Sequence, residues 1–305
     1  MKKLILALLL FLAGTAAFAQ NMQTYKYAER DTLNLYLDFY TPETVYDSTI
    51  CMVYVFGGGF IGGHRDGKWE KAYFKKLVDA GFQVASIDYR LGLKGAKSLS
   101  IFNTEPLEKA IYMATEDAIL ALAYLLEHAK ELKINKDYIV MIGSSAGAIT
   151  ALQTDYAMCN GFLNSGILPQ DFRLAGVVSY AGAIFSHEGL VKYRNREPAP
   201  TMLFHGVRDN LVSYKGIGFM NIGFFGADAL VKRFKKYGYP YFVRRFEDYG
   251  HSIALAGSVT VDDLLWFCRH YVYGKERIQV DGTYTNLDPQ TMPPYDYYTP
   301  SDLYK

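Results

Sequence analysis

The 305-residue sequence has few cysteines, few histidines and almost no net charge. Its three cysteines are too few for a disulfide scaffold, and neither Cys-x-x-Cys nor His-Glu-x-x-His occurs. Cys51 and Cys268 stand in apolar runs typical of buried cysteine, and the sequence leaves open whether one disulfide forms among these two and Cys159. The formal net charge of +1 argues against nucleic acid or an anionic membrane as a partner. These absences argue against the common metal-binding motifs and against nucleic-acid or anionic-membrane binding.

Long apolar runs are also missing, except at the N-terminus. Residues 4–13 are nearly all apolar, follow Lys2 and Lys3, and precede the small-residue site Ala17-Phe18-Ala19. This pattern predicts a secretory signal peptide, because the run is shorter than the roughly 20 residues that span a bilayer. Without its two lysines the mature chain has 30 basic and 31 acidic residues. We expect a soluble, exported protein, either periplasmic or secreted.

The rest of the chain alternates apolar β-branched runs with helix-prone segments and shows no repeat. Such alternation predicts an α/β fold with a mostly parallel twisted sheet and helices on both faces. Strands are expected near residues 51–56, 82–87, 138–142, 175–180, 201–205 and 241–246. Helices are expected near residues 69–80, 106–132, 146–158, 227–237 and 259–273. The predicted organisation is a signal peptide (1–19), one catalytic domain (20–275) and a Tyr/Pro-rich tail packed on it (276–305).

One short motif carries a specific chemistry. Gly143-Ser-Ser-Ala-Gly147 follows a predicted strand and opens a predicted helix. A tight strand-to-helix turn of the form Gly-x-Ser-x-Gly exposes the central hydroxyl, here that of Ser145, and its flanks admit only small residues. The helix N-terminus behind it aims the N–H of Ala146 at developing negative charge. This context favours a nucleophilic serine over a small residue in an ordinary turn.

Two later segments supply partners for this serine. Asp209 follows one predicted strand and His251 follows the next, so both lie where parallel sheets build sites. A serine needs a base, and a carboxylate that orients the imidazole completes the set. The order Ser145, Asp209, His251 assigns His251 as base and Asp209 as its orienter. Asp248 is too near His251 in sequence to reach round the ring, and His205 is expected to pack or hydrogen-bond locally.

A triple glycine, Gly57 to Gly59, follows the first core strand. Backbone without Cβ atoms approaches a ligand closely, so the N–H groups of Gly58 and Gly59 are expected to join that of Ala146 in an oxyanion hole. The run Gly57-x-Gly59-x-x-Gly62 also matches a dinucleotide fingerprint. That interpretation is disfavoured, because a Rossmann turn leads straight into its helix and six residues intervene here.

With these residues identified, the chain resembles the α/β-hydrolase esterases and lipases that carry a His-Gly-Gly-Gly motif, from about residue 35 to residue 273. The resemblance implies a Ser145–Asp209–His251 triad and an oxyanion hole from Gly58, Gly59 and Ala146. It also implies hydrolysis of carboxylic esters without metal or organic cofactor. The chain departs from the pattern at one position, where Phe56 replaces the histidine that braces the glycine loop.

Substrate contacts are harder to assign. Residues 215–226 are glycine-rich and aromatic and begin shortly after Asp209, so they form either an apolar loop packed on the body or a lid beside the pocket. We assign substrate contact to Phe60, Phe219 and Phe224. The tyrosines of the tail either wrap on the surface or contact a sugar chain.

The sequence thus predicts an exported serine carboxylesterase that hydrolyses short-acyl or aryl esters, including esters on carbohydrate. The expected partner is a small-molecule or carbohydrate ester, with no nucleic acid and no membrane, and the oligomeric state is not readable. Two alternatives stay open: a serine peptidase of the same fold, and a non-catalytic binding protein that retains the hydrolase fold.

Overall fold

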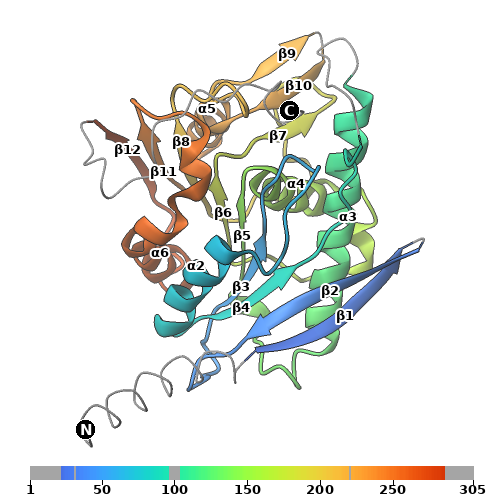
Figure 1. Cartoon of the computed structure of the whole chain (residues 1–305). Coiled ribbons are helices and arrows are strands. Elements are labelled where there is room, and N and C mark those ends of the chain that lie inside the picture. The colour runs from blue at the N-terminus through green and yellow to red at the C-terminus, as the bar shows by residue number, and fades with distance from the viewer. Residues whose placement is uncertain (1–21, 31, 96–103, 220, 286–305) are drawn as a thin grey trace, which may run out of the picture.

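A nine-stranded sheet forms the centre of the molecule (Figure 1). The computed structural model describes residues 22–30, 32–95, 104–219 and 221–285, so the predicted signal peptide and most of the tail lie outside the described residues. The strand order is β1-β2-β4-β3-β5-β6-β8-β11-β12. The strands are β1 (Met22–Arg30), β2 (Leu33–Tyr40), β3 (Cys51–Val55), β4 (Gln83–Ile87), β5 (Ile139–Ser144), β6 (Gly176–Tyr180), β8 (Thr201–Gly206), β11 (Tyr241–Phe246) and β12 (Gln279–Tyr284).

Seven neighbouring strands, from β4 to β12, run parallel, and β1 and β2 join one edge antiparallel. Every residue of β3, β5, β6 and β8 is buried, as expected for strands covered on both faces. Val55 pairs with Gly143, and Gly206 pairs with Phe246. The loops that follow β3, β5, β8 and β11 therefore emerge at one edge of the sheet.

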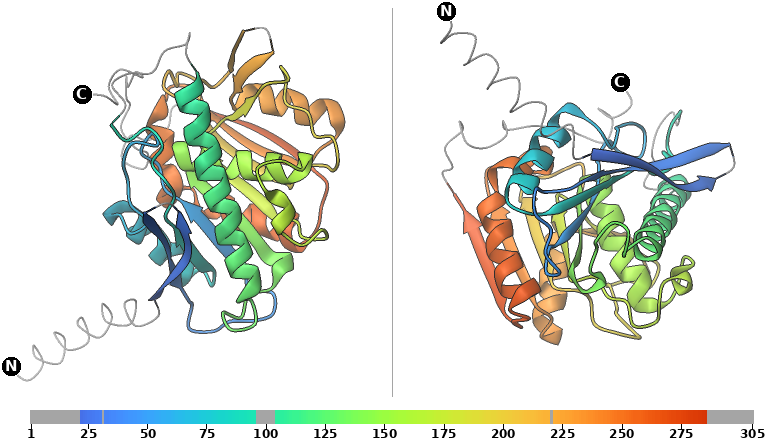
Figure 2. Two further views of the ribbon diagram at one scale, coloured as in Figure 1. Left: turned by 90° about the vertical axis from the view of Figure 1, so that its right-hand side faces the viewer. Right: turned by 90° about the horizontal axis from the view of Figure 1, so that it is seen from below.

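Helices cover both faces of the sheet (Figure 2). The helices are α2 (Lys68–Asp79), α3 (Glu105–Glu127), α4 (Ala146–Asn160), α5 (Ala227–Tyr237) and α6 (Val261–Phe267). α3 and α4 lie on one face, and α2 and α6 lie on the other. On β11, Tyr241 contacts Phe234 of α5 while its neighbour Phe242 contacts Trp266 of α6, so these two helices lie on opposite faces. This arrangement confirms the predicted fold class.

The helix that begins at the serine turn is unusually enclosed. All residues of α4 from Ala146 to Cys159 are buried, because the helix lies between the sheet and α3. Its sequence is mostly apolar or small, and its buried Gln153 and Asp155 accept backbone N–H groups of Phe185 and Ala199. The turn in front of α4 is consequently attached to one of the most rigidly packed elements of the fold.

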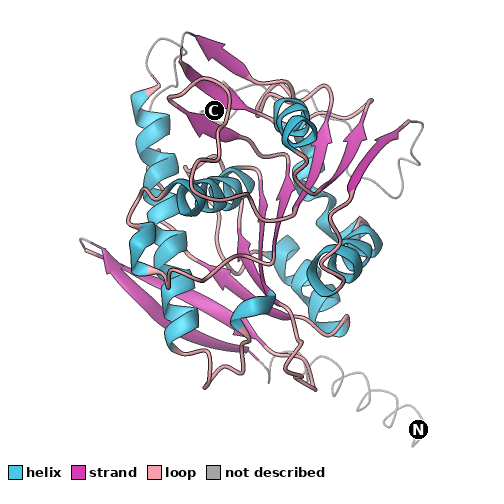
Figure 3. Ribbon diagram, turned by 180° about the vertical axis from the view of Figure 1, so that it is seen from behind, coloured by secondary structure: helices cyan, strands magenta, loops and turns pink. Residues whose placement is uncertain are grey.

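The segment expected to be a loop at 215–226 is a β-hairpin. β9 (Ile217–Phe219) and β10 (Ile222–Phe225) pair antiparallel, and β10 also pairs with β7 (Ile184–Ser186) in a separate three-stranded sheet. This small sheet lies at the end of the molecule toward which the parallel strands point (Figures 1 and 3).

The C-terminal end of the described chain adds one more element. β12 pairs parallel with β11 through six residue pairs, so part of the segment 276–305 belongs to the main sheet. The helix expected at 259–273 is divided into α6 and a π-helical turn at Cys268–Tyr273, preceded by a 3-10 helix at His251–Val259. All three cysteines are buried and unbridged. Among the described residues, no helix is both long and apolar enough to span a membrane.

Candidate active site

Ser145 occupies a strained turn between β5 and α4. Its backbone φ is 51° and its ψ is −120°, a conformation that a non-glycine residue rarely adopts. A Cβ on Gly143 would lie 2.2 Å from the carbonyl oxygen of Gly147, and a Cβ on Gly147 would lie 2.0 Å from that of Val55. Both flanking glycines are therefore required by close backbone contact. The Ser145 N–H donates to the carbonyl oxygen of Tyr180 at 2.8 Å, which ties the turn to β6.

The predicted partners of Ser145 meet it at the same sheet edge. Ser145 Oγ lies 2.7 Å from His251 Nε2, and His251 Nδ1 lies 2.8 Å from Asp209 Oδ2. The ionised Asp209 accepts from Nδ1–H, which leaves Nε2 free to accept the serine proton. The His251 side chain is 10% exposed, whereas that of Asp209 is fully buried. The three side chains thus form a continuous hydrogen-bonded relay with its serine end toward solvent.

The Asp209 carboxylate is stabilised in its charged form. Burial by itself raises the pKa of this carboxyl, but hydrogen bonds from His205 and His251 outweigh burial and hold the pKa well below the ordinary value. Oδ1 also accepts the N–H groups of Leu211 and Val212, each at 2.9 Å. Charge-assisted hydrogen bonds of this kind favour the ionised carboxylate. Asp209 is therefore ionised across the pH range in which an ester hydrolase works.

His205 contacts the relay, which the sequence did not predict. Its side chain is 1% exposed, and its Nε2 lies 2.9 Å from the Val212 carbonyl oxygen and 3.3 Å from Asp209 Oδ2. An Nε2–H shared between these acceptors gives Asp209 Oδ2, which also accepts from His251, a second donor. The expectation of a local hydrogen bond is confirmed by the bond to Val212, and the contact with Asp209 is additional.

A second tether joins the serine turn to the His251 segment. Ser144 Oγ donates to the carbonyl oxygen of Ala254 at 2.7 Å. Tyr180 OH lies 2.9 Å from Thr260 Oγ1 at the end of the same 3-10 helix. These bonds anchor the segment carrying His251 to β5 and β6, the strands that flank the serine turn.

The glycine run lies beside the serine. A Cβ on Gly57 would be 3.2 Å from Ser145 Cβ. Gly58 and Gly59 have φ values of 117° and 63°, and a Cβ on Gly58 would be 2.2 Å from the carbonyl oxygen of Gly62. Within the described part of the chain, the N–H groups of Gly58, Gly59 and Ala146 donate to no protein acceptor. These three backbone donors are therefore available near the serine, and their role as an oxyanion hole stays a prediction.

Tyr89 braces the start of this loop. The resemblance gives this bracing role to a histidine at position 56, where this chain has Phe56. The Tyr89 ring stacks on Phe56 with centroids 4.4 Å apart, and its hydroxyl donates to the Phe56 carbonyl oxygen at 3.0 Å. Phe60, assigned to substrate contact from sequence, is 1% exposed and packs edge-on against Tyr89. Its ring fills the core beneath the loop, so in this structure it presents no surface to a ligand.

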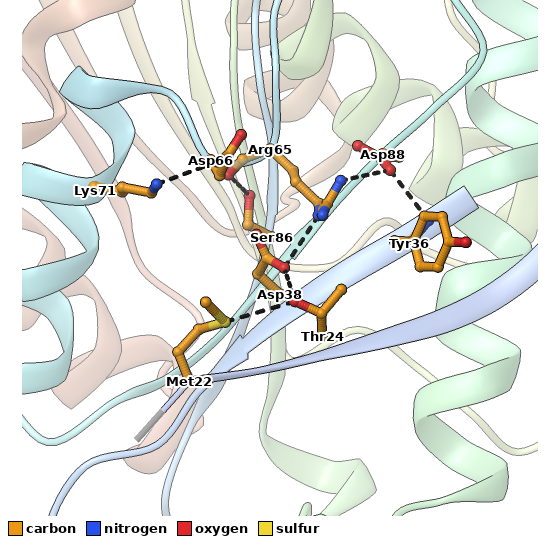
Figure 4. A network of polar contacts seen from close by, with 9 residues as sticks. All are labelled: Met22, Thr24, Tyr36, Asp38, Arg65, Asp66, Lys71, Ser86 and Asp88. Carbon is orange, nitrogen blue, oxygen red and sulfur yellow. Dashed lines mark hydrogen bonds and ion pairs between the residues drawn. The ribbon is translucent and has the colours of Figure 1, made fainter. Parts of the chain in front are cut away.

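Arg65 anchors the other end of the loop (Figure 4). Its guanidinium lies 3.1 Å from Asp38 Oδ1 of β2 and 2.9 Å from Asp88 Oδ2 just after β4. Its carbonyl oxygen accepts from Ser86 Oγ at 2.7 Å. The neighbouring Asp66 pairs with Lys71 of α2. The loop is thus fixed to the sheet on both sides of its glycines.

The remaining predicted contact residues lie in the small sheet. Phe224 is half-buried in β10. Phe219 belongs to β9, and its side chain lies outside the described residues. Their substrate-contact role stays a prediction. In the described residues no group of three metal-ligating side chains is close enough to hold an ion.

Comparison with known proteins places this geometry in a family context. Residues 37–184 match the family model BD-FAE, an α/β-hydrolase-type esterase family. Three solved structures of esterase 2 from Thermogutta terrifontis are similar. The form phosphoramylated by tabun is 19% identical over 83% of this chain and 96% of that chain, with a TM-score of 0.60. This chain has the fold of the α/β-hydrolase esterases.

The apo and propionate-bound forms of the same esterase are each 18% identical to this chain. Each aligns over 86% of this chain and 97% of its own length, with a TM-score of 0.60. At this identity the structures establish the fold. The partial match to an esterase family model and the esterase structures of the same fold support the chemistry of a carboxylic ester hydrolase. No curated protein matches this chain.

Proposed function

We propose that this hydrolase is an exported serine esterase that cleaves short-acyl or aryl esters, including esters carried on carbohydrate, through an acyl-enzyme. The observation that carries the proposal is the relay from Ser145 Oγ to His251 at 2.7 Å and from His251 to Asp209 at 2.8 Å. A relay of this form turns a weakly nucleophilic hydroxyl into one that attacks carbonyl carbon.

In the first half-reaction, Ser145 Oγ attacks the ester carbonyl while His251 Nε2 takes its proton. The negative charge on the carbonyl oxygen is stabilised by the N–H groups of Gly58, Gly59 and Ala146. His251 then gives its proton to the leaving alcohol, and the serine keeps the acyl group. In the second half-reaction, His251 removes a proton from water, water attacks the acyl carbon, and Ser145 recovers its proton.

The proposal of short or aryl acyl groups rests on the small sheet and on the comparisons. The β9–β10 hairpin is interrupted by glycine at 216, 218, 223 and 226, unlike a continuous amphipathic lid with one apolar face. The solved esterase from Thermogutta terrifontis has been observed with propionate and with butyrate bound. Export, inferred from residues 1–19, would bring the enzyme to polymer fragments outside the cell.

A short chromogenic acyl ester tests the mechanism. Ser145→Ala is expected to lower kcat by a factor of about 10⁴ or more, because the nucleophile is lost while the fold is kept. A serine-reactive phosphonate should label the parent protein at Ser145 and leave the variant unlabelled. Equal hydrolysis by parent and variant would exclude Ser145 as nucleophile, and an unlabelled parent would favour the non-catalytic alternative.

Substrate panels test the finer assignment. Acetyl, propionyl, butyryl and aryl esters should be cleaved faster than long-chain esters, and aminopeptide amides should not be cleaved. Activity that rises with acyl length and with a lipid interface would contradict the short-acyl proposal. Sequencing the mature N-terminus after expression with the native leader should give Gln20 as the first residue if the signal peptide is processed as proposed.

A further inference from the structure

Two adjoining hollows lie beside α5 and the β9–β10 hairpin. The larger, of 370 Å³, is formed by α5, the β9–β10 hairpin and the segment at Leu190 and Val191. The smaller, of 290 Å³, is formed by residues 192–194 together with Tyr237 and Tyr239. Arg233 of α5 lines both, so the hollows adjoin. Together they have the size of sites that hold small ligands, which run from about 300 to 1,000 Å³.

The two hollows, together called the α5 groove below, are strongly basic. Six cationic side chains line it: Lys192, Arg194, Lys215, Lys232, Arg233 and Lys236. Only one carboxylate, that of Asp228, lines it as well, and it pairs with Lys232 at 2.7 Å. Arg194 pairs with Glu188 outside the lining. Across the described residues, the other four cations have no carboxylate within ion-pair distance. The groove therefore offers uncompensated positive charge on a protein that is otherwise near neutral.

Its walls are apolar and aromatic between the charges. Leu190 is 58% exposed, and Phe225 and the two glycines 216 and 218 complete the wall of the larger hollow. In the smaller hollow the Arg233 guanidinium lies 4.4 Å from the Tyr237 ring centre, and Tyr239 stacks on Tyr237 with centroids 5.7 Å apart. The groove thus combines flat apolar surface with charge and phenolic hydroxyls.

We infer that the α5 groove binds an anionic polysaccharide, through the carboxylates of uronic acid residues, and so holds the polymer that carries the ester. Uronate carboxylates match the bidentate geometry of arginine and the charge of lysine, and the apolar faces of sugar rings match the walls. This inference rests on the proposed function for the identity of the polymer as a substrate.

Shape and ring packing favour this ligand over two other polyanions. A lipid bilayer is flat and does not enter concave hollows. Single-stranded nucleic acid is held largely by bases stacking on open aromatic faces. In the groove Arg233 covers one side of the Tyr237 ring, and Tyr239 stacks on the same ring. The phenol groups remain as hydrogen-bonding edges, which suit hydroxyl-rich sugars.

A short path of contacts joins the groove to the catalytic relay. Lys215 follows Tyr214, whose ring centre lies 5.6 Å from that of His205. His205 in turn contacts Asp209. The segment from Asp209 to Lys215 therefore runs from the relay to the wall of the groove and links the two regions along the chain.

Binding to polygalacturonate tests the inference directly, measured by calorimetry on the Ser145→Ala protein so that no ester is consumed. The double variant Arg233→Ala/Lys236→Ala, made in that background, should weaken binding about tenfold or more, because two contacting charges are lost. A matched control, Lys130→Ala/Arg269→Ala, removes the same charge at two exposed positions outside the groove. It should change affinity less than about twofold. Thermal unfolding checks that all proteins are folded.

The outcomes separate this inference from the esterase proposal. Neutral xylan should bind much more weakly than polygalacturonate, and affinity should fall as salt rises. Equal weakening by both double variants would mean that only net charge matters and would overturn the inference. Tighter binding of single-stranded DNA or of anionic phospholipid vesicles would overturn it too. Loss of Ser145-dependent ester hydrolysis would instead defeat the proposed function, while polymer binding to the groove would stand.

On acetylated polygalacturonate, the groove variant in the active protein should raise KM with little change in kcat, because binding outside the reacting centre is lost equally from substrate and transition state. The ratio of kcat/KM on this polymer to kcat/KM on a small chromogenic ester should fall about tenfold. An unchanged ratio would show that the groove does not serve the polymeric ester.

Discussion

The serine turn and the glycine loop face each other across the ends of β5 and β3, yet they are held by different forces. At the serine turn, backbone atoms contact one another so closely that Gly143 and Gly147 admit no Cβ. At the glycine loop, side chains from elsewhere in the sheet, Tyr89 and Arg65 above all, hold the backbone in place. Close backbone contact occurs in both regions, since a Cβ on Gly58 would lie 2.2 Å from the Gly62 carbonyl oxygen. The loop also has side-chain braces that can be removed one at a time, so its geometry can be adjusted by small steps.

The largest expected effect tests the relay attached to the turn. Asp209→Asn should lower kcat by about 10⁴, because the amide no longer fixes the productive His251 tautomer. Steady-state hydrolysis of a chromogenic ester measures the loss, and near-parental thermal stability would show that geometry is kept. A loss below about tenfold would contradict the role of Asp209.

The next prediction compares a glycine of the serine turn with a glycine of the loop. Gly147→Ala should destabilise the protein by about 3–5 kcal/mol or prevent folding, since its Cβ would lie 2.0 Å from the Val55 carbonyl oxygen. Gly62→Ala in the loop is the matched control, because a Cβ there meets no atom within 4 Å. It should change stability by less than about 0.5 kcal/mol in urea unfolding. Equal effects would remove the distinction between the two regions.

A smaller effect is expected at His205, which supports the relay without contacting the serine. His205→Phe should lower kcat about tenfold, and His205→Gln should recover much of it, because an amide N–H can replace the donor to Asp209. A merely structural role would give the same kcat for both variants at matched stability.

His205→Phe should also change how the stability of the protein depends on pH. Ionised Asp209 stabilises the folded state because its pKa is held below the ordinary value of 3.8. That contribution is fully present above the ordinary pKa and is lost as the pH falls through the lower folded-state pKa. Removing His205 raises the folded-state pKa, so the pH-dependent stability gap between parent and His205→Phe should be widest at neutral pH and narrow in acid. Urea midpoints across acidic pH values measure this gap, and a gap that widens in acid would contradict it.

The smallest effect belongs to the loop brace. Tyr89→Phe removes the hydroxyl that donates to the Phe56 carbonyl oxygen and should lower kcat about three- to tenfold with little change in KM, because the loop amides act on the developing oxyanion. Tyr273→Phe is the control, since its hydroxyl donates to the Ser48 carbonyl oxygen on the surface. A KM effect with unchanged kcat at Tyr89→Phe would place the loop in substrate binding instead.

Much of the site was predictable because its parts are local. A strand, Gly-x-Ser-x-Gly and a helix specify the turn at Ser145 within a dozen residues, and strand ends in a parallel sheet meet at one edge. Asp209 and His251 each follow such an end, so sequence order assigned them and the structure brings both to hydrogen-bonding distance. Apolar periodicity likewise predicted the core strands and the fold class.

Only the tertiary structure decided which side chains hold these parts. Tyr89 lies 33 residues from Phe56 in sequence, and Ser144 lies 110 residues from Ala254. No periodicity or spacing encodes such pairs, because they depend on how distant strands and loops pack. The same reason explains why Phe60 fills the core, why β12 joins the sheet and why six cations gather along the α5 groove. The amino-acid sequence determines which chemical groups follow each strand, and packing across the sheet determines how firmly each group is held.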